Sequence, residues 1–174
     1  MAYSVTQLNV LSRDAFVAAL GHVVEHSPWV VADAFDRRPF ADREALAAAL
    51  ADAIRAASRE RQLALIRAHP ELAAPRGRSA APSRELTRES TREQASAGLD
   101  RLTPDELARF HRLNEAYRAR FGFPFVICVR EHDKEGILAS FEERLGHTPD
   151  EEVAAAVGQI GRIVRLRVLD AVAE

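Results

Sequence analysis

The same helix-start signal occurs twice in the sequence, and this repetition constrains the fold more than any other feature. Thr-Pro-Asp-Glu stands at 103–106 and again at 148–151. In each copy threonine can cap a helix, proline fits the first helical position, and glutamate can bond back to the cap. Apolar residues at helical spacing, beginning with Leu107 and Phe110, follow the first copy. The second copy is expected to start a helix that runs to about Ala171.

Further helices are predicted in the first half of the chain. They begin at the candidate caps Ser12, Asp42 and Ser58, and each cap precedes apolar residues at helical spacing. The first of them is expected to end near Ser27-Pro28. Alanine, arginine, leucine and glutamate dominate the composition, and all four favour helices. The predicted fold class is therefore all-α, with residues 1–174 forming a single-domain bundle of several helices.

Two segments interrupt the helical pattern. Residues 74–83 hold Pro75, Gly77 and Pro82 among small and basic residues, which predicts an exposed loop. The run FGFPFVICVR is continuously apolar and contains a proline, so a short extended segment is expected near residues 123–130. Periodicity alone leaves open whether this run is a strand or an extended buried segment.

Length and composition exclude several classes of protein. The 174 residues fit one domain with a sizeable core, and the formal net charge of −2 suggests neither nucleic acid nor an anionic membrane as partner. The apolar runs are too short to cross a bilayer. Because Cys128 is the only cysteine, an internal disulfide and a Cys-rich zinc site are excluded. The N-terminal residues show no secretory signal, so a cytoplasmic protein is expected.

His69 lies where a helix should stop. In a helix that starts after Ser58, Leu65 and Ile66 share a face with His69, and Pro70 disfavours helical geometry at the residue before it. An imidazole at a helix end can point into a cleft and move protons. Taken alone, the pattern favours a boundary histidine bonded to a nearby carbonyl over a catalytic one.

The stretch LTRESTREQASAGL, residues 86–99, predicts a very short helix. Ser90 and Glu93 have the spacing of a capping box, and Gly98 suits the far end of the helix. This structural interpretation leaves Gln94 unexplained. A helix start with a carboxylate close by can also bind polar groups of a ligand.

The last helix places an arginine among apolar residues. Val153, Val157, Ile160 and Val164 form one stripe, and Arg167 falls inside it. A core-facing arginine must be paired with an acid or face a polar cavity. A structural role, either in a buried ion pair or with the charged end reaching solvent near the helix terminus, is as compatible with this pattern as ligand binding.

Metal binding has little support in the sequence. His22 and His26 have the spacing of two ligands on one helix face, but no acidic or cysteine partner stands at a recognisable ligand spacing. Solvated surface histidines are therefore the favoured interpretation. The sequence also lacks a Gly-rich phosphate loop, a nucleophile elbow and a metalloprotease motif.

Taken together, several segments resemble the family of 2-oxo-4-hydroxy-4-carboxy-5-ureidoimidazoline (OHCU) decarboxylases. The resemblance covers nearly the whole chain in order and is therefore far more specific than any single motif. The matching segments are SPWV at 27–30, RPF at 38–40, AHPELA at 68–73, LTRESTREQASAGL at 86–99, LNEAYRARFGFPFVICVR at 113–130, FEERL at 141–145 and QIGRIVRLRV at 159–168.

This resemblance implies an all-α fold, usually a homodimer, and decarboxylation of OHCU to (S)-allantoin without a cofactor or a metal. It assigns catalysis to His69 and Glu93. It assigns substrate binding to a further set of residues, namely Pro70, Ser90, Gln94, Phe125, Val126, Ile127 and Arg167. The loop after the histidine motif departs from the family pattern, so Arg76 and Arg78 receive no role.

Two other functions stay open at this stage. One is a helical module of the same fold that binds a ligand or partner without catalysis, and the other is a lyase acting on a related ureide. A degenerate binding module would be expected to have lost His69, Glu93 or Arg167, and all three are present.

Overall fold

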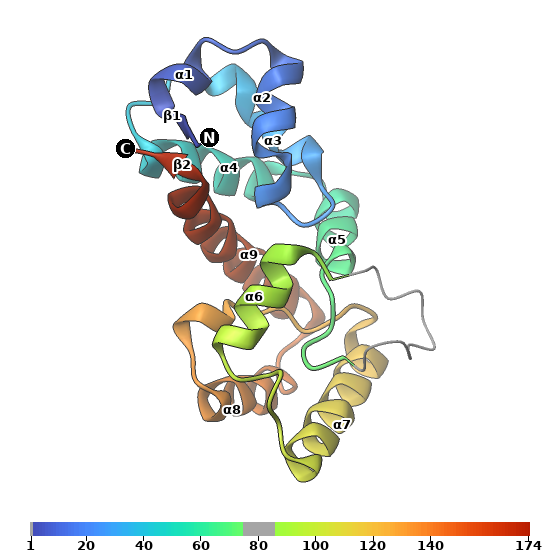
Figure 1. The fold of residues 1–174 in the computed structure, drawn as a ribbon. Helices are drawn as coiled ribbons and strands as arrows, with labels where there is room; N and C mark the ends of the chain where they lie inside the picture. The colour runs from blue at the N-terminus through green and yellow to red at the C-terminus, as the bar shows by residue number, and fades with distance from the viewer. Residues whose placement is uncertain (1, 75–85) are drawn as a thin grey trace. The chain divides into compact units, whose positions relative to one another are not determined.

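The computed structural model describes residues 2–74 and 86–174. Most of the loop predicted at 74–83, including Arg76 and Arg78, lies outside the described residues. Contacts group the described chain into two compact units, one formed by residues up to Leu65 together with Ile160–Glu174, the other by Ile66–Gln159. Helices dominate both units, as Figure 1 shows, which confirms the predicted all-α class. The single domain predicted for residues 1–174 stays a prediction.

The first unit contains the elements from both ends of the chain. They are β1 (Tyr3–Ser4), α1 (Val5–Asn9), α2 (Arg13–Leu20), the 3-10 turn η1 (Gly21–Val23), α3 (Pro28–Ala34), the 3-10 turn η2 (Phe35–Arg37), α4 (Arg43–Ala56), most of α5 (Arg59–Ala68), the second half of α9 (Pro149–Ala171) and β2 (Val172–Ala173). β1 pairs with β2 in parallel over two residues each. This short ladder ties the two ends of the chain together within the unit.

Packing of α3 against α2 and α4 forms the core of the first unit. The fully buried side chains include Phe16 of α2 with Leu46 and Leu50 of α4. A single continuous helix from Ser12 to Ser27 is a wrong prediction, because α2 ends at Leu20 and Pro28 starts a separate helix. Proline suits a first helical position, so α3 begins at Pro28, whereas α2 has already ended at Leu20, before Gly21 and the 3-10 turn η1.

The second unit consists of the remaining helices and the extended segment. Its elements are the last residues of α5, α6 (Arg88–Ser96), α7 (Pro104–Phe121), the 3-10 turn η3 (Val129–Glu131), α8 (Lys134–Arg144) and the first half of α9. Both Thr-Pro-Asp-Glu signals behave as predicted. Thr103 forms a reciprocal capping box with Glu106, and Thr148 exchanges the same pair of bonds with Glu151.

Aromatic rings form the core of the second unit. The rings of Phe125 and Phe141 stack with centroids 3.8 Å apart, and Tyr117 meets both rings edge-on. Residues 124–128 form neither helix nor strand, and residues 125–128 are buried. The structure therefore decides the alternative left open by the sequence: this run is an extended buried segment, anchored by the Phe125 ring rather than by strand pairing.

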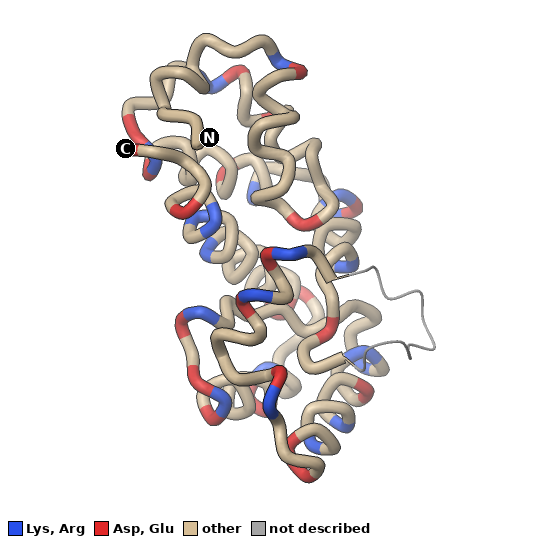
Figure 2. Tube along the Cα trace, in the orientation of Figure 1, with Lys and Arg blue, Asp and Glu red and all other residues tan. Residues whose placement is uncertain are grey.

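Charges are distributed evenly over both units. Basic and acidic positions are interspersed along the chain in both units, as Figure 2 shows. Among the described helices, none is long and apolar enough to cross a membrane.

Candidate active site

His69 lies directly after the end of α5, as its sequence context predicts. Its backbone N–H donates to the carbonyl of Ile66 at 3.1 Å, a tightened last turn, and Pro70 follows outside the helix. Leu65 and Ile66 are completely buried, and 8% of His69 is exposed. The helix thus ends at Ala68, just before the residue whose helical geometry Pro70 disfavours, and His69 lies at the boundary of the core.

Side chains from two helices hold the turn that follows His69. Asn114 of α7 donates through Nδ2 to the carbonyl of Leu72 at 2.8 Å. The N–H of Ala73 donates to Oε1 of Gln94 at 3.1 Å, and the carbonyl of Ala73 lies 3.2 Å from Nε2 of His111. Ala73 has a φ of 53°, a left-handed conformation that alanine rarely adopts. Bonds to both its N–H and its C=O stabilise this conformation.

The helix α6 begins one turn earlier than the sequence predicts. Its cap is Thr87, whose hydroxyl accepts from the N–H of Ser90 at 3.2 Å. The capping box predicted from Ser90 and Glu93 is therefore wrong: Ser90 is the third residue of the helix. Positions three and four apart share a face, so Ser90 lies on one face with Glu93 and Gln94. Ser90 is buried, with 5% exposed.

Gln94 connects α6 to the turn after His69. Because a backbone N–H requires an acceptor, its bond with Ala73 fixes which amide atom of Gln94 is the oxygen. Among the described residues, the Nε2 group of Gln94 donates to no acceptor. The helix ends as predicted, with Gly98 at a φ of 77° just beyond the cap Ala97.

The extended segment lies beside α6. Burial raises the pKa of the Cys128 thiol to about 11, and the carboxylates of Glu131 and Glu93 raise it further. Glu93 therefore lies close enough to act on the end of this segment, and α6 packs against η3, which follows Cys128 directly. The second unit thus brings together α6, the segment 125–128 and the turn after His69.

Two side chains that sequence analysis did not single out hold the backbone of this segment. Arg144 of α8 donates through NH1 to the carbonyl of Val126 at 2.7 Å, and the N–H of Cys128 donates to Oε1 of Gln159 at 3.0 Å. Arg144 stands three residues after the buried Phe141, so it interrupts an apolar face just as Arg167 does. A charged residue on an apolar helix face can be recognised in the sequence, so Arg144 could have been identified there by the same pattern as Arg167.

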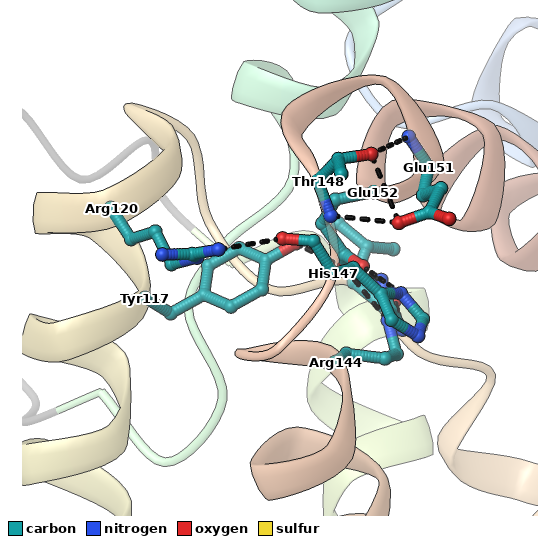
Figure 3. Close-up of polar contacts among 8 residues, drawn as sticks. Tyr117, Arg120, Arg144, His147, Thr148, Glu151 and Glu152 are labelled. Carbon is teal, nitrogen blue, oxygen red and sulfur yellow. Dashed lines mark hydrogen bonds and ion pairs between the residues drawn. The ribbon is translucent and has the colours of Figure 1, made fainter.

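Arg144 belongs to a buried polar cluster around Glu152 of α9, drawn in Figure 3. Oε1 of Glu152 accepts from Nε of Arg144 at 2.7 Å and from the hydroxyl of Tyr117. Its other oxygen lies 2.9 Å from Nδ1 of His147. Burial, together with the carboxylate of Glu152, raises the pKa of Tyr117, so this hydroxyl stays protonated and donates. The cluster is thereby a charged part of the core, in which the buried Arg144 and Glu152 form an ion pair.

Arg167 lies in the first unit, where it forms a buried ion pair. Its NH1 group donates to Oε2 of Glu25 at 2.9 Å, and both side chains are at most 4% exposed. This is the acid pairing that the sequence left open. A bond between Arg167 and a substrate is not tested by this contact and stays a prediction.

No metal site is found in the part of the chain that the structure describes. Residues 2–74 and 86–174 contain no group of three or more His, Cys, Asp and Glu side chains able to hold a metal ion. His26 lies 3.9 Å from the carboxylate of Glu25, and the exposed His22 lies on the 3-10 turn η1.

The second unit therefore combines groups suited to proton transfer and to binding a polar ligand. An imidazole can serve as a general acid or base, and the carboxylate on α6 can accept a proton. A serine hydroxyl and an amide on the same helix can bind carbonyl or N–H groups. Such a set fits a small molecule rich in amides.

Comparison with known sequences gives a consistent result. The family model described as OHCU decarboxylase matches residues 9–169. A 2-oxo-4-hydroxy-4-carboxy-5-ureidoimidazoline decarboxylase from Haloferax volcanii is 42% identical over 164 residues, which is 94% of this chain and 93% of that protein. The protein of the same name from Amia calva is also 42% identical, over 94% of this chain and 91% of its own length.

Two solved structures are also similar. A crystal structure of (S)-allantoin synthase matches with a TM-score of 0.72 and 29% identity; the match covers 97% of this chain and 54%, about half, of that one. A crystal structure of OHCU decarboxylase in the presence of (S)-allantoin matches with a TM-score of 0.66, over 90% of this chain and 96% of that one. At 18% identity, the second match shows the fold alone.

Proposed function

Because the chain belongs to the OHCU decarboxylase family, we propose that it decarboxylates OHCU to (S)-allantoin, the last step from urate to allantoin. The observation that carries this proposal is the family match over residues 9–169, together with relatives of that name that are up to 42% identical over nearly their full length. The residues that the family pattern assigns to the site are present in this chain.

The reaction needs proton transfer rather than a cofactor. The carboxylate leaves a carbon next to a ring carbonyl, so the substrate itself accepts the electron pair of the broken C–C bond. The product of that step is an enolate-like anion, which hydrogen-bond donors stabilise. One proton must then reach carbon from a fixed side to give the (S) product. This chemistry supports a decarboxylase without metal, thiamine or pyridoxal phosphate.

We assign the proton transfer to His69 and Glu93. His69 lies just after a helix end followed by Pro70, and the residue is buried. Facial selectivity requires a proton donor that stays in one place, and burial favours this. Glu93 lies on α6, the helix bonded to the turn after His69 through Gln94. An imidazole with a nearby carboxylate can remove a proton from the substrate hydroxyl or deliver one to carbon.

Gln94 is proposed to donate rather than accept. Its Oε1 atom is occupied by the N–H of Ala73, so the Nε2 group is the part of this side chain offered to a ligand. A ring or ureido carbonyl of the substrate is the matching acceptor. Ser90 on the same face, Pro70, and the backbone of Phe125, Val126 and Ile127 complete the proposed binding set.

Three further proposals rest on the family resemblance. Arg167 holds the substrate, with Glu25 fixing the direction of its guanidinium. The protein is a homodimer, which sedimentation velocity tests directly. It works in the cytoplasm, which a fluorescent fusion tests.

The function is tested by generating OHCU in place from urate and following its decay by circular dichroism. We expect the purified protein to accelerate the decay and to give (S)-allantoin, whereas spontaneous decay gives racemic product. His69→Ala is expected to lose nearly all of this acceleration. His22→Ala is the matched control: His22 is exposed and distant from His69 in the sequence, so this variant is expected to keep full activity.

Two outcomes would contradict the proposal in different ways. A decay rate and a racemic product equal to the spontaneous ones would leave the non-catalytic binding module, or a lyase for another ureide, as the function. Full activity in His69→Ala would refute the assigned mechanism but not the reaction. Dialysis against EDTA is expected to change nothing, and strong inhibition would reopen a role for His22 and His26.

A further inference from the structure

The extended segment is held from two sides, with one residue left between the two contacts. Arg144 binds the carbonyl of Val126 at 2.7 Å, and Gln159 accepts from the N–H of Cys128 at 3.0 Å. Between them, the N–H and C=O of Ile127 bond to no group among the described residues. Ile127 is 3% exposed. Buried backbone groups are almost always paired, so these two groups require a partner.

The direction of these groups follows from the geometry of the peptide bond. The bond between Val126 and Ile127 is trans, and in a trans peptide the C=O and the next N–H point in opposite directions. Since the Val126 carbonyl points to Arg144, the N–H of Ile127 points away from it. By the same argument, the carbonyl of Ile127 points away from Gln159. Two side chains therefore set where both groups of Ile127 are directed.

Arg144 is well suited to hold a peptide plane in one orientation. Its side chain is 7% exposed, its Nε donates to Oε1 of Glu152 at 2.7 Å, and its guanidinium carbon lies 4.4 Å from the ring centroid of Phe125. The NH2 group lies 2.5 Å from the same carboxylate oxygen in a buried ion pair. Tyr117 donates to the same carboxylate, as Figure 3 shows. Because the guanidinium is planar and its Nε is bound to Glu152, the NH1 group that binds the Val126 carbonyl has a fixed direction.

We propose that Arg144 is a positioning residue, which fixes the peptide plane after Val126 so that the N–H of Ile127 donates to an oxygen of the ureidoimidazoline as negative charge develops on it. This inference rests on the proposed function and names the backbone donor of that same site. Arg144 does not touch the substrate in this scheme. It acts through the orientation of one N–H group, and the cluster around Glu152 keeps that orientation rigid.

A purely structural role for the cluster predicts a different outcome. Replacing a buried ion pair changes stability, and a structural role would change stability alone. A positioning role changes the chemical step, because a donor that binds the developing anion acts on kcat more than on KM. The two roles are therefore separated by kinetics on folded variants.

The test compares Arg144→Lys and Gln159→Leu with a matched control. Lysine keeps a positive charge for Glu152 but cannot serve both the carboxylate and the Val126 carbonyl in one plane. Gln159→Leu removes the second contact at a half-buried position, and so supplies a folded variant if Arg144→Lys fails to fold. Arg109→Ala removes an exposed ion pair with Glu142 in the same unit and is expected to retain full activity.

We expect Arg144→Lys to lower kcat by at least about 10-fold with KM changed by less than about 3-fold, since removing one donor to an oxyanion costs about 100-fold or more. Gln159→Leu is expected to lower kcat in the same way but less. Amide NMR gives the direct readout. Addition of (S)-allantoin to the parent protein is expected to shift the Ile127 N–H resonance downfield, and this shift should vanish in Arg144→Lys.

The outcomes separate this inference from the proposed function. An active parent whose Ile127 amide does not respond to (S)-allantoin overturns the inference and leaves the decarboxylase intact. Unchanged kcat in folded Arg144→Lys, or in folded Gln159→Leu if the lysine variant does not fold, overturns it as well. A parent without decarboxylase activity overturns the function itself. Loss of kcat together with loss of the amide shift supports the positioning role.

Discussion

Replacing Asn114 tests how the turn after His69 is held. The Asn114 side chain is 4% exposed, and its Nδ2 group donates to the buried carbonyl of Leu72 at 2.8 Å. Asn114→Leu keeps a similar volume but leaves this carbonyl without its partner. The cost of an unpaired buried acceptor is about 1–3 kcal/mol. In a chain of this size, that corresponds to a fall in Tm of roughly 2–12 °C.

Asn114→Asp is expected to be worse at neutral pH and to recover on acidification. An ionised carboxylate would place a second acceptor against the Leu72 carbonyl, and burial adds a desolvation penalty. The introduced carboxyl therefore has a folded-state pKa above its unfolded value. Its protonated form donates to the carbonyl, so the stability deficit is smallest below the unfolded pKa and grows as the pH rises through the folded pKa.

The assay is urea denaturation followed by circular dichroism at several pH values, with decarboxylation measured on the same samples. Arg118→Gln is the matched control: Arg118 lies on the same helix and binds Glu71 of the same turn, but in an exposed ion pair at 2.9 Å. Such pairs contribute at most about 1 kcal/mol. Asn114→Leu should lose more stability than this control and also lose activity, because the turn adjoins His69.

Either of two results would refute this reasoning. One is an Asn114→Leu variant that unfolds at the same urea concentration as Arg118→Gln and keeps its kcat. The other is an Asn114→Asp variant whose deficit does not shrink as the pH is lowered.

Three further predictions follow from single groups. The Cys128 thiol, with its pKa raised to about 11 from an ordinary 9.0, should resist iodoacetamide in the native protein at pH 8 and react once the chain is unfolded. Because this pKa is raised on folding, its contribution to the unfolding free energy is full below pH 9 and should decline as the pH rises through 11, which a pH series of urea melts measures. The bond from Lys134 lowers the pKa of Glu106, so this ion pair contributes its full stabilisation above the ordinary value of 4.5 and loses it as the pH falls through the folded pKa. Glu106→Gln should therefore make the unfolding free energy depend less on pH at acidic pH. An unchanged dependence would contradict this. Thr87→Ala should lower the unfolding free energy by about 1 kcal/mol because Thr87 caps α6. Thr91→Ala, at an exposed threonine of the same helix, should change it by less than about 0.5 kcal/mol, and equal effects in urea melts would show that the cap is elsewhere.

Helix starts were largely predictable because the interactions that make them are local. Each cap accepts a bond from a backbone N–H three residues later, so both partners lie within one short stretch of sequence. The caps are Ser12, Asp42, Thr103 and Thr148. The stop before His69 is equally local, since Pro70 restricts only the residue before it. Caps and proline stops of this kind depend on neighbouring residues, so they can be predicted without knowing the fold.

The start of α6 was mispredicted because two local signals compete there. Thr87 and Ser90 are both good caps, and only Ser90 is followed by glutamate at the capping-box position. The structure uses Thr87, which makes Ser90 a helical residue that packs against the core. Ser90 is the residue of this extra turn that is buried, and burial is a property of the assembled unit.

The sequence by itself determined the all-α class, the positions of most helix ends, and the placement of His69 at one of them. The tertiary structure alone decided which distant groups meet: Gln94 with Ala73, Asn114 with Leu72, and Arg144 with Val126, contacts that span 21, 42 and 18 residues. Capping and proline effects act over about four residues, whereas a side chain reaches a distant carbonyl only after packing has brought the two segments together. The family pattern could name candidate site residues, but only packing set the direction of their donors.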